Sequence, residues 1–461
     1  MATKIIEDER IQPLNDVGIA GAGEYVLYWM QQSQRAQDND ALEVAIQQAN
    51  ELGQPLLVAF GLTDDYPEAN VRHYTFMLEG LQETQQALQQ RGIKMIVRRG
   101  LPSQVALNLG QAASLIVCDR GYLRHQRAWR EEVAASAGRR VLQVEADVVV
   151  PVETASDKAE YAARTIRPKI HRYLDRFLVS RRTTPLENHS LELDVDGVDL
   201  GDTGALLSEL DLDRTVAAVS ALYPGGTTVA RRRLNRFIDR HLPAYDEHRN
   251  QPETDDVSHM AMYLHFGQIS PVTVALAIRD SGAPQGEVDS YLEELIVRRE
   301  LAVNFVYYTG DYEQYGMLPE WARKTLSEHR DDERPHRYSR PELEAGETHD
   351  PYWNAAMGEM RDTGYMHNYM RMYWGKKILE WSDTPEEAYE TALALNNRYF
   401  LDGRDPNSYA GVGWIFGLHD RAWGERPIFG KIRYMSAGGL KRKGDPEAYV
   451  GKVDRLREQV K

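Results

Sequence analysis

The sequence predicts an α/β N-terminal domain, built on a parallel sheet of the Rossmann-like kind, followed by an all-α domain. Between Glu24 and Val152 short apolar runs alternate with longer segments of helical spacing, a pattern typical of strand–helix–strand units around a parallel sheet. Beyond Leu222 most long segments have helical spacing and strand-like runs become scarce. With 461 residues the chain is long enough for two or three domains.

Five apolar runs bounded by glycine, proline or polar residues are predicted to be strands. They are EYVLYW (24–29), PLLVAFG (55–61), KMIVRR (94–99), SLIVCD (114–119) and RVLQVEADVVV (140–150). After the first run, Leu42 and Ile46 lie at helical spacing and Gly53 offers a C-terminal cap, so we expect a helix there. The single cysteine, Cys118, lies in the fourth run and is expected to be a buried strand thiol.

The second half begins after an acidic, turn-rich segment, Thr183 to Gly204, which has no sustained period and predicts a connection. We therefore expect an N-terminal extension at 1–20, the α/β domain at 21–155, a connecting segment at 156–225 and the helical domain at 226–461. Predicted helices include YLEELIVRRELAVNFVYY (291–308) and PEEAYETALALNNRYF (385–400), the latter starting from a Thr384–Glu387 capping box. The charged run at 328–342 predicts an exposed loop.

The composition and the absence of targeting patterns indicate which broad class of protein to expect. Hydrophobic residues make up 42% and charged residues 27%, so we expect a folded globular chain rather than a disordered one. The N-terminus lacks the basic-then-apolar order of a signal peptide, and no run is long enough to span a membrane. With one cysteine, these features favour a reducing intracellular compartment, cytoplasmic or nuclear, without a membrane partner. The net charge of -15 argues mildly against nucleic acid, although local basic patches can override it.

Several common sites are unsupported. Gly18, Gly21 and Gly23 precede the first strand, whereas a dinucleotide fingerprint must follow a strand. The sequence has no phosphate-loop motif, no HExxH and no cysteine pair, so we expect no metal site.

The segment HNYMRMYWGKKILEW (367–381) carries a broad apolar helix face. Trp374 and Trp381 are seven residues apart, so their rings are expected on nearly the same side, separated by roughly 10 Å of axial rise. Such spacing suits stepwise electron transfer. Spacing alone fits a packed core stripe equally well.

Several segments, in order along most of the chain, resemble the photolyase and cryptochrome family, and most closely the class II cyclobutane pyrimidine dimer photolyases. They are YVLYWMQQSQRAQDNDAL, YDEHRN, YLHFGQISP, YLEELIVRREL, THDPYWNAAMGEM, the 367–381 segment, LNNRYFLDGRDPN, GVGWIFG and RPIFGKIRYM. The resemblance implies FAD bound in the helical domain, active in its reduced, anionic form. It also implies a possible antenna chromophore of unknown identity in the N-terminal domain.

The resemblance assigns residues to the flavin. Positions expected near its phosphates are Tyr245, Ser258, His259, Met260 and Ala261. Ala261 and Met262 stand where the family usually has serine and proline, so backbone amides at a helix N-terminus are expected to make these contacts. Arg371 and Asp402 match an ion pair beside the isoalloxazine ring, where the positive charge would favour the reduced anion. Asn396 matches the class II asparagine near flavin N5, and Asp405 and Asn407 complete the expected set.

The resemblance also assigns the lesion site and an electron path. Glu294 matches a glutamate that hydrogen-bonds a dimer carbonyl, and Met372 and Trp414 match apolar walls against the flipped-out dimer. Photolyases for the 6-4 photoproduct carry histidine at the position of Met372, which favours cyclobutane dimers. Trp374, Trp353 and Trp381 resemble the chain that reduces oxidised flavin, and the place of Trp353 rests wholly on the family match.

Contacts to DNA phosphates are expected from basic side chains. These are Arg249, Lys431, Arg433, Lys441, Arg442 and Lys443. Arg421 and Trp423 could wedge into the space left by the flipped bases.

Taken together, the resemblance implies a deoxyribodipyrimidine photo-lyase, expected to act as a monomer on UV-damaged double-stranded DNA. Light would excite reduced FAD, an electron would pass to the dimer, the cyclobutane ring would split and the electron would return. Two alternatives stay open at this point: a cryptochrome-like flavin photoreceptor without repair activity, and a light-independent, nucleotide-dependent ligase or hydrolase built on the α/β domain.

Overall fold

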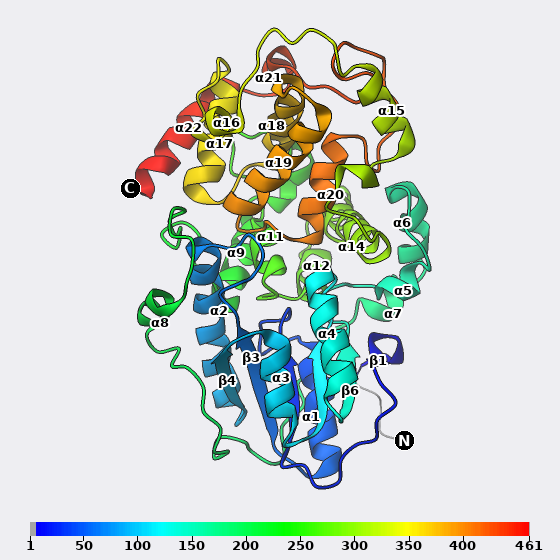
Figure 1. Cartoon of the computed structure of the whole chain (residues 1–461), viewed down its shortest axis with the longest axis vertical. Coiled ribbons are helices and arrows are strands. Elements are labelled where there is room, and N and C mark those ends of the chain that lie inside the picture. Colours follow the sequence, from blue (N-terminus) through cyan, green and yellow to red (C-terminus); the bar gives the residue numbers. More distant parts are fainter. Residues whose placement is uncertain (1–5, 461) are drawn as a thin grey trace.

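A six-stranded sheet lies at the centre of the N-terminal region (Figure 1). In the computed structural model, which describes residues 6–460, the strand order is β1-β6-β5-β2-β3-β4. Strands β2 to β6 are parallel, and β1 pairs antiparallel with β6. The strands are β1 Ile11–Pro13, β2 Tyr25–Met30, β3 Leu56–Leu62, β4 Lys94–Arg99, β5 Ala113–Asp119 and β6 Arg140–Val144.

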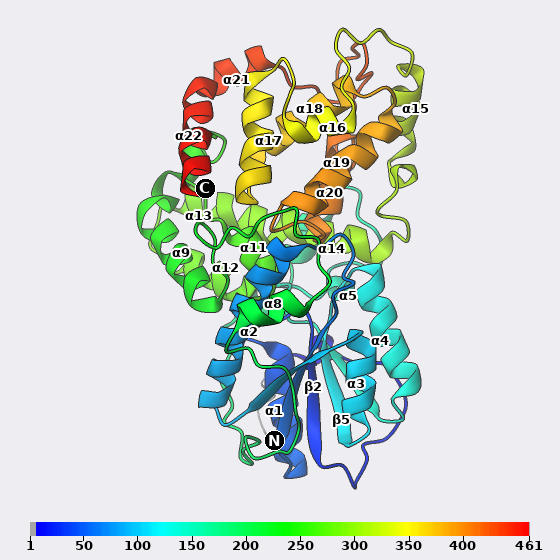
Figure 2. The same ribbon diagram turned by 60° about the vertical axis from the view of Figure 1, so that its left-hand side comes forward.

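Helices cover both faces of this sheet (Figure 2). On one face, α1 (Asp40–Leu52) and α2 (Val71–Gln90) pack against alternate residues of β2 and β3. On the other face lie α3 (Pro102–Gly110) and α4 (Arg124–Ser136). The predicted α/β class is confirmed, as is the helix that ends at Gly53, whose φ of 63° gives the left-handed cap.

Two details of the sheet correct the sequence prediction. The antiparallel edge strand β1 lies within the expected N-terminal extension and was missed, because three residues ending in proline carry no alternation to detect. The run 140–150 is a strand only to Val144. Beyond it the chain leaves the sheet, because the backbone N–H groups of Val149 and Val150 donate to the buried Glu300 carboxylate of the helical region. The apolar residues that follow Val144 pack into two cores of the helical region and not against the sheet.

The rest of the described chain is helical, and its helices enclose two further hydrophobic cores. They are α5 Val152–Ala155, α6 Ala163–His171, α7 Leu174–Phe177, α8 Thr203–Glu209, α9 Thr227–Arg240, α10 Tyr245–His248, α11 Met260–His265, α12 Pro271–Arg279, α13 Gln285–Leu292, α14 Arg299–Tyr308, α15 Glu320–Glu328, α16 Arg340–Ala345, α17 Pro351–Thr363, α18 Asn368–Trp381, α19 Pro385–Tyr399, α20 Pro406–Ile415, α21 Ala437–Lys443 and α22 Pro446–Gln459. A π-helical turn, Glu293–Arg298, joins α13 to α14. The capping box at Thr384 is confirmed: its Oγ accepts the N–H of Glu387 at 3.2 Å.

The expected connecting segment, 156–225, contains α6, α7 and α8, and residues 183–202 have no helix or strand. Helices α6 and α7 contribute Ile166, Ile170 and Phe177 to a core of the helical region. The domain boundaries stay a prediction. The charged loop between α15 and α16 is mostly exposed, as predicted. Among residues 6–460, no helix combines the length and the apolarity needed to cross a membrane.

The buried cysteine is confirmed. Cys118 on β5 has no exposed surface, and burial raises the pKa of its thiol to about 12. The thiolate is therefore scarce at neutral pH, which fits a packing role.

Arg72 on α2 joins the two regions. Its guanidinium donates to the carbonyl oxygens of Arg361 at 2.6 Å and Tyr399 at 2.7 Å, close to the C-terminal ends of α17 and α19. A third bond, at 2.9 Å, goes to the carbonyl oxygen of Ala217. Burial lowers the pKa of Arg72 to about 10, although the charge of Asp362 acts against this effect. The hydrogen-bond acceptors of the guanidinium are carbonyl groups, which include groups at negative helix ends.

A second buried arginine fixes the carboxyl edge of the sheet. Arg35 pairs with Asp147 at 2.7 Å and donates to the carbonyl oxygen of Gly267 at 3.0 Å. Gly267 has φ +64°, and a Cβ there would lie 1.8 Å from the carbonyl oxygen of Gln32, so only glycine permits this approach.

We predict that Arg72→Ala lowers the free energy of unfolding by about 3–5 kcal/mol, because it leaves buried carbonyl groups without donors. The measurement is the urea unfolding midpoint followed by circular dichroism. Arg99→Ala is the control, since Arg99 lies on the surface and should cost less than about 1 kcal/mol. Equal, small losses for both variants would contradict the role of Arg72.

Candidate functional site

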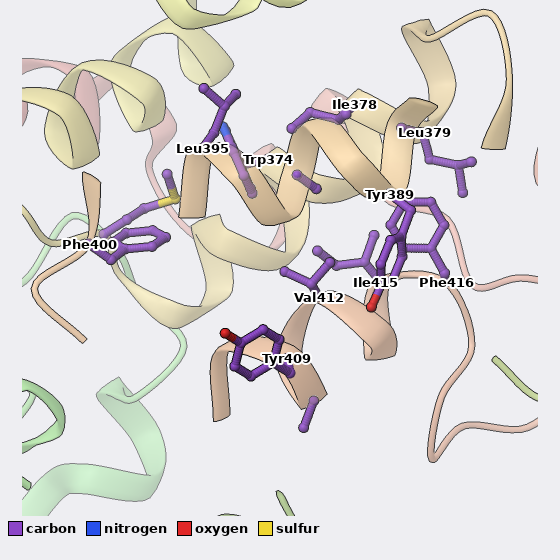
Figure 3. Packing of buried hydrophobic residues seen from close by; sticks show 14 of the residues in the cluster. Trp374, Ile378, Leu379, Tyr389, Leu395, Phe400, Tyr409, Val412, Ile415 and Phe416 are labelled. Carbon is purple, nitrogen blue, oxygen red and sulfur yellow. The ribbon is translucent and has the colours of Figure 1, made fainter. Parts of the chain in front are cut away.

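Helix α18 is the scaffold of the site. The side chain of His367 caps it, with Nδ1 accepting the N–H of Tyr369 at 3.2 Å. The sequence predicted one broad apolar face, but residues 373–379 are all buried, so burial extends around the helix, which packs against α17, α19 and α20. Figure 3 shows the part of this core in which Trp374 and Ile378 lie opposite side chains of α19 and α20.

The fold brings Trp353 to the α18 tryptophans. Its indole N–H donates to the backbone carbonyl of Trp374 at 2.9 Å, and its ring centroid is 5.5 Å from that of Trp381. The three side chains are 0%, 1% and 2% exposed. Three tryptophans thus form one buried group, with Trp353 supplied by α17, a placement that helical spacing could not reveal.

A partly buried ion pair lies one turn before Trp374. Arg371 binds Asp402 through two hydrogen bonds of 3.1 Å and 3.0 Å, and its Nε donates to the carbonyl oxygen of Met366 at 2.9 Å. The guanidinium also lies 3.8 Å from the centre of the Phe400 ring. The Arg371 and Asp402 side chains are only 20% and 15% exposed, which excludes a surface salt bridge. The predicted pairing of these two residues is therefore present.

The residues expected near the flavin phosphates are linked to this ion pair through Tyr365. The rings of His259 and Tyr365 have centroids 4.5 Å apart, and the Arg371 guanidinium is 5.8 Å from the Tyr365 ring. On the other side, Tyr291 donates its hydroxyl to Ser258 Oγ at 2.9 Å and packs against Tyr245 at 5.3 Å. Residues from separate segments thus form one continuous set of contacts. No spacing in the sequence indicated Tyr365 or Tyr291.

The start of α11 fits the expected use of backbone amides. The helix begins at Met260, so the N–H groups of Met260 and Ala261 belong to its first turn and have no acceptor within the helix, although Met260 lies 3.4 Å from Ser258 Oγ. His259, with φ 55°, pairs through Nε2 with Asp255 at 2.9 Å. Although burial raises the pKa of Asp255, the hydrogen bond and charge of His259 lower it to about 2.

The polar groups of this region fit a large anionic ligand such as FAD. Several buried ring nitrogens in the described part of the chain have no hydrogen-bond partner, and three of them lie in this region: Nδ1 of His259, Nε2 of His367 and Nε1 of Trp374. Buried polar atoms normally have partners, so these atoms favour a polar group bound beside them. Burial and the nearby Lys452 lower the pKa of His367 to about 3, which keeps its ring neutral and able to hydrogen-bond in either direction.

The remaining expected cofactor residues lie on α19 and α20. Asn396 is buried, and its amide donates to Asn397 Oδ1 at 3.1 Å. Asp405 caps α20 through the N–H of Asn407 at 2.8 Å, and the Asn407 side chain donates to the same oxygen. Asp405 also pairs with His265 at 3.2 Å. Their capping and packing contacts account for these positions, and their roles toward a flavin stay predictions.

Glu294 lies in the π-helical turn and is held by Arg249. Arg249 Nη2 is 2.7 Å from Glu294 Oε1, and Nη1 donates to Ser290 Oγ at 3.0 Å. Although burial lowers the pKa of Arg249, the charge of Glu294 raises it overall. Arg249, which the sequence assigns to DNA phosphates, therefore lies beside the residue assigned to the lesion.

The two expected apolar walls lie on different helices. Trp414 on α20 lies under Arg298, whose guanidinium is 5.2 Å from the ring centre. Arg298 also pairs with Glu293 at 3.2 Å. Met372 on α18 is half-buried against the C-terminal core. No pattern in the sequence indicated a role for Arg298.

The basic residues expected at DNA are exposed, apart from Arg249. Arg421 and Arg433 lie 4.7 Å and 5.2 Å from the Trp423 ring centre, and Trp423 is 39% exposed. On α21, Lys441 pairs with Glu447 at 3.0 Å, while Lys443 Nζ lies 5.4 Å from the ring of Tyr369 at the start of α18. Lys431 and Arg442 are exposed in the same two segments. Lys441, Arg442 and Lys443, which we call the basic tail, thus lie next to the N-terminal part of α18, which carries Met372.

A separate pocket opens where the carboxyl ends of β2 and β3 meet the helical region. Ligands of doubly wound sheets bind at such an edge. Its lining includes Gln31, Tyr66, Trp129, His265 and Arg404. Within residues 6–460, no group of three or more His, Cys, Asp or Glu side chains is arranged to hold a metal ion.

Comparison with known proteins adds a sequence relationship. Residues 26–189 match the DNA photolyase family. The chain is 49% identical over 456 residues to a deoxyribodipyrimidine photo-lyase of Methanothermobacter thermautotrophicus, covering 99% of this chain and 100% of that protein. It is 41% identical to a deoxyribodipyrimidine photo-lyase of Potorous tridactylus, over 93% of this chain and 81% of the relative. The protein of the same name from Arabidopsis thaliana is 40% identical, over 94% and 89%.

Solved structures show the same architecture. A bacterial class III photolyase from Agrobacterium tumefaciens superposes with a TM-score of 0.74 at 18% identity, covering 94% of this chain and 86% of that one. A cryptochrome from Synechocystis gives a TM-score of 0.71 at 16% identity, over 92% and 87%. At these identities the likeness concerns the fold alone.

Proposed function

Because the chain belongs to the photolyase and cryptochrome family, we propose that it repairs cyclobutane pyrimidine dimers in DNA by light-driven electron transfer, as a class II photolyase. Its similarity to deoxyribodipyrimidine photo-lyases extends over nearly the whole chain. The class assignment rests on the resemblance of the site segments, above all the Asn396 position and the tryptophan set. Met372 beside Arg371, where 6-4 enzymes have histidine, supports cyclobutane dimers as the substrate.

The observation that carries this proposal is that Glu294 and the residue over the Trp414 ring lie in the same helical turn. Glu294 and Arg298 lie four residues apart in the π-helical turn, and Arg298 covers the Trp414 ring at 5.2 Å. A carboxyl group and the cover of an aromatic wall therefore come from one turn. This combination suits a flipped-out pyrimidine pair, which offers carbonyl oxygens to hydrogen bonds and flat apolar faces to aromatic rings. A photoreceptor without repair activity would have no use for it.

The site residues prepare a place for FAD, which when reduced and excited by light would supply the electron that opens the cyclobutane ring. Arg371 provides a fixed positive charge, held by Asp402 and by the Met366 carbonyl. Such a charge favours an anionic ring system next to it. Asn396, buried on α19, would hold a hydrogen bond at flavin N5.

The three buried tryptophans would return oxidised flavin to its reduced form. Trp374 is the member nearest Arg371 along α18, and Trp353 contacts both Trp374 and Trp381. The Trp353 and Trp381 rings are in contact, the Trp353 indole is bonded to the Trp374 backbone and all three side chains are shielded from water, so an electron could pass along them in short steps. These contacts support an electron path in the order Trp381, Trp353, Trp374.

Binding to DNA would use the basic tail and the Trp423 loop. Lys441, Arg442 and Lys443 lie beside the α18 terminus, so phosphate contacts there would bring a lesion toward Met372. Arg249 would exchange its bond with Glu294 for a phosphate, which frees the carboxyl group for the lesion. The pocket at the sheet edge is the place we assign to the antenna chromophore, with lining from both regions rather than from the N-terminal domain alone.

The first test is repair by the purified protein. We predict flavin bands in its visible spectrum and light-dependent repair of a dimer-containing oligonucleotide. Glu294→Ala should lower the repair rate about 10- to 100-fold, the factor for one charge-assisted hydrogen bond, while flavin stays bound. Glu247→Ala, an exposed glutamate of neighbouring α10, is the control and should repair normally. Unchanged repair in Glu294→Ala would remove its assignment, and flavin bands without repair in the unmodified protein would favour the photoreceptor.

The tryptophan set makes a separate prediction. Trp374→Phe should abolish photoreduction of oxidised flavin and spare repair by chemically reduced enzyme, because the variant breaks the supply of electrons only. Flavin absorbance under illumination and oligonucleotide repair measure the two activities. Trp321→Phe, on α15, is the matched control. Loss of both activities in Trp374→Phe would argue against a chain that is separable from repair.

DNA affinity should fall with added salt, because the contacts are ionic. The double variant Lys441→Ala, Arg442→Ala should reduce the slope of log affinity against log salt by about 2, since each phosphate contact contributes about 0.9. Arg99→Ala should leave the slope unchanged. A slope unaffected by the double variant would place the DNA elsewhere.

A further inference from the structure

His259 is a buried side chain with an unused nitrogen. Its side chain is 7% exposed, and Nδ1 has no hydrogen-bond partner within the described residues. The ring lies between two aromatic rings, with its centroid 4.5 Å from that of Tyr365 and 5.5 Å from that of Tyr223. Residue 259 also has a φ of 55°, which is uncommon for a residue other than glycine. Because buried nitrogen atoms normally have a partner, Nδ1 favours a polar group of a ligand beside it.

Asp255 determines which nitrogen of the His259 ring carries the hydrogen. Its Oδ1 lies 2.9 Å from Nε2 of the ring. The pKa of Asp255 is about 2, so its carboxylate is ionised at neutral pH and only accepts hydrogen bonds. Nε2 must therefore donate. In a neutral imidazole, Nδ1 then has a lone pair and no hydrogen, and this lone pair repels an anion. Only the doubly protonated ring offers an anion a donor at Nδ1.

The loop that carries Asp255 is held by the C-terminal helix α22. Lys452 on this helix is 9% exposed, and its Nζ donates to the carbonyl oxygens of Pro252 at 3.0 Å and Thr254 at 2.5 Å. The same ammonium group lies 4.0 Å from Asp255 Oδ1. The Asp255 side chain itself reaches the surface, where 64% of it is exposed, so protons can exchange with solvent there. The two carbonyl contacts fix the backbone and keep the carboxylate against the ring.

The charges around His259 come from several elements. Asp255 lies on the loop before α11, Glu359 on α17 and Lys452 on α22. The other titratable side chains near the ring are Tyr223, Tyr365 and His367. Burial raises the pKa of both tyrosines well above the ordinary value and lowers that of His367 to about 3, so these three are uncharged at neutral pH. Lys452 thus faces two carboxyl groups, and this group of side chains has no surplus of positive charge for an anionic ligand.

We propose that His259 binds a phosphate group of FAD as an imidazolium, so that binding of the flavin takes up one proton. The inference rests on the proposed function. A proton from solvent adds to the Nδ1 lone pair, the ring gains one positive charge, and the new N–H donates to a phosphate oxygen. The bond from Nε2 to Asp255 is kept, and the carboxylate and the phosphate both favour the charged ring. Ala261 and Met262 have no side-chain hydroxyl, so His259 supplies the charged donor of this segment.

The affinity for FAD should therefore depend on pH. Because binding takes up a proton, the affinity falls as the pH rises, by up to about tenfold in Kd for each pH unit above about 7. Equilibrium dialysis of the holoenzyme against buffers between about pH 6 and pH 9 measures this Kd. Riboflavin, which has the same ring system but no phosphate, is the matched ligand. Its affinity should change little over the same range.

His259→Asn removes the charge and keeps a donor. Asparagine tolerates a positive φ, so the variant should fold, but at pH 7 it should bind FAD about 10- to 100-fold more weakly and without pH dependence. Its affinity for riboflavin should be unchanged. Asp255→Asn should weaken FAD binding at pH 7 and move its pH dependence to lower pH. Asp256→Asn, in the same loop but paired with His241 and His248, is the matched control and should behave as unmodified protein.

Thermal midpoints show whether each variant folds. An FAD affinity that is independent of pH in unmodified protein, or that keeps its pH dependence in His259→Asn, would overturn the proposal. Loss of the dependence in Glu359→Gln together with its survival in His259→Asn would assign the proton to Glu359 and would also overturn it.

The failure of the proposed function has a different appearance. Proton-linked FAD binding by a protein that repairs no dimer would remove the repair and keep the inference. If the protein holds no flavin, the proposed function fails. Titration of the full chain with inorganic pyrophosphate in weakly buffered solution then decides the inference: proton uptake that His259→Asn abolishes supports it, and binding without proton uptake, or no binding, overturns it.

Discussion

The hydrogen bonds of Arg72 are the contacts on which the site geometry depends. One side chain of α2, 2% exposed, holds carbonyl oxygens close to the ends of α17 and α19. Helix α17 supplies Trp353, α19 supplies Asn396, and the turn after α19 supplies Asp402. A carboxylate could have paired with this arginine, but it would have fixed one side chain only. Carbonyl groups at two helix ends fix two backbones at once, and their dipoles offset the cost of burying the charge.

The carboxyl edge of the sheet both contacts the helical region and borders a pocket. Arg35 and Asp147 anchor it to the helical region at Gly267, and Glu300 takes the N–H groups of Val149 and Val150. The pocket that we assign to the antenna lies next to the first of these contacts, since Gln34 and Phe266 line it. A chromophore held there would touch side chains of both regions, so the contacts that join the regions would also set its distance from α18.

Much of the fold could be predicted from the sequence, because local chemistry determines it. The parallel strands are apolar runs between turn residues, and α1 and α19 carry their own caps at Gly53 and Thr384. The predictions that failed concern segments whose structure depends on residues far along the chain. The apolar residues after Val144 look like more strand, and only Glu300, far along the chain, shows why they leave the sheet. The π-helical turn that carries Glu294 has no signature in a pattern of helical spacing.

The site, like the fold, has features that the local sequence predicts and features that depend on distant contacts. Spacing placed Trp374 and Trp381 on one face of a helix, and family resemblance named Trp353, but neither could show that Trp353 contacts both. Tyr338 lies in a run whose charges indicate a solvated loop, and that description is correct for most of it. One aromatic side chain turns inward because the end of α18 offers a free carbonyl and an indole ring. Tyr338 and His349 therefore cover Trp381, and the outer end of the tryptophan set is shielded from water.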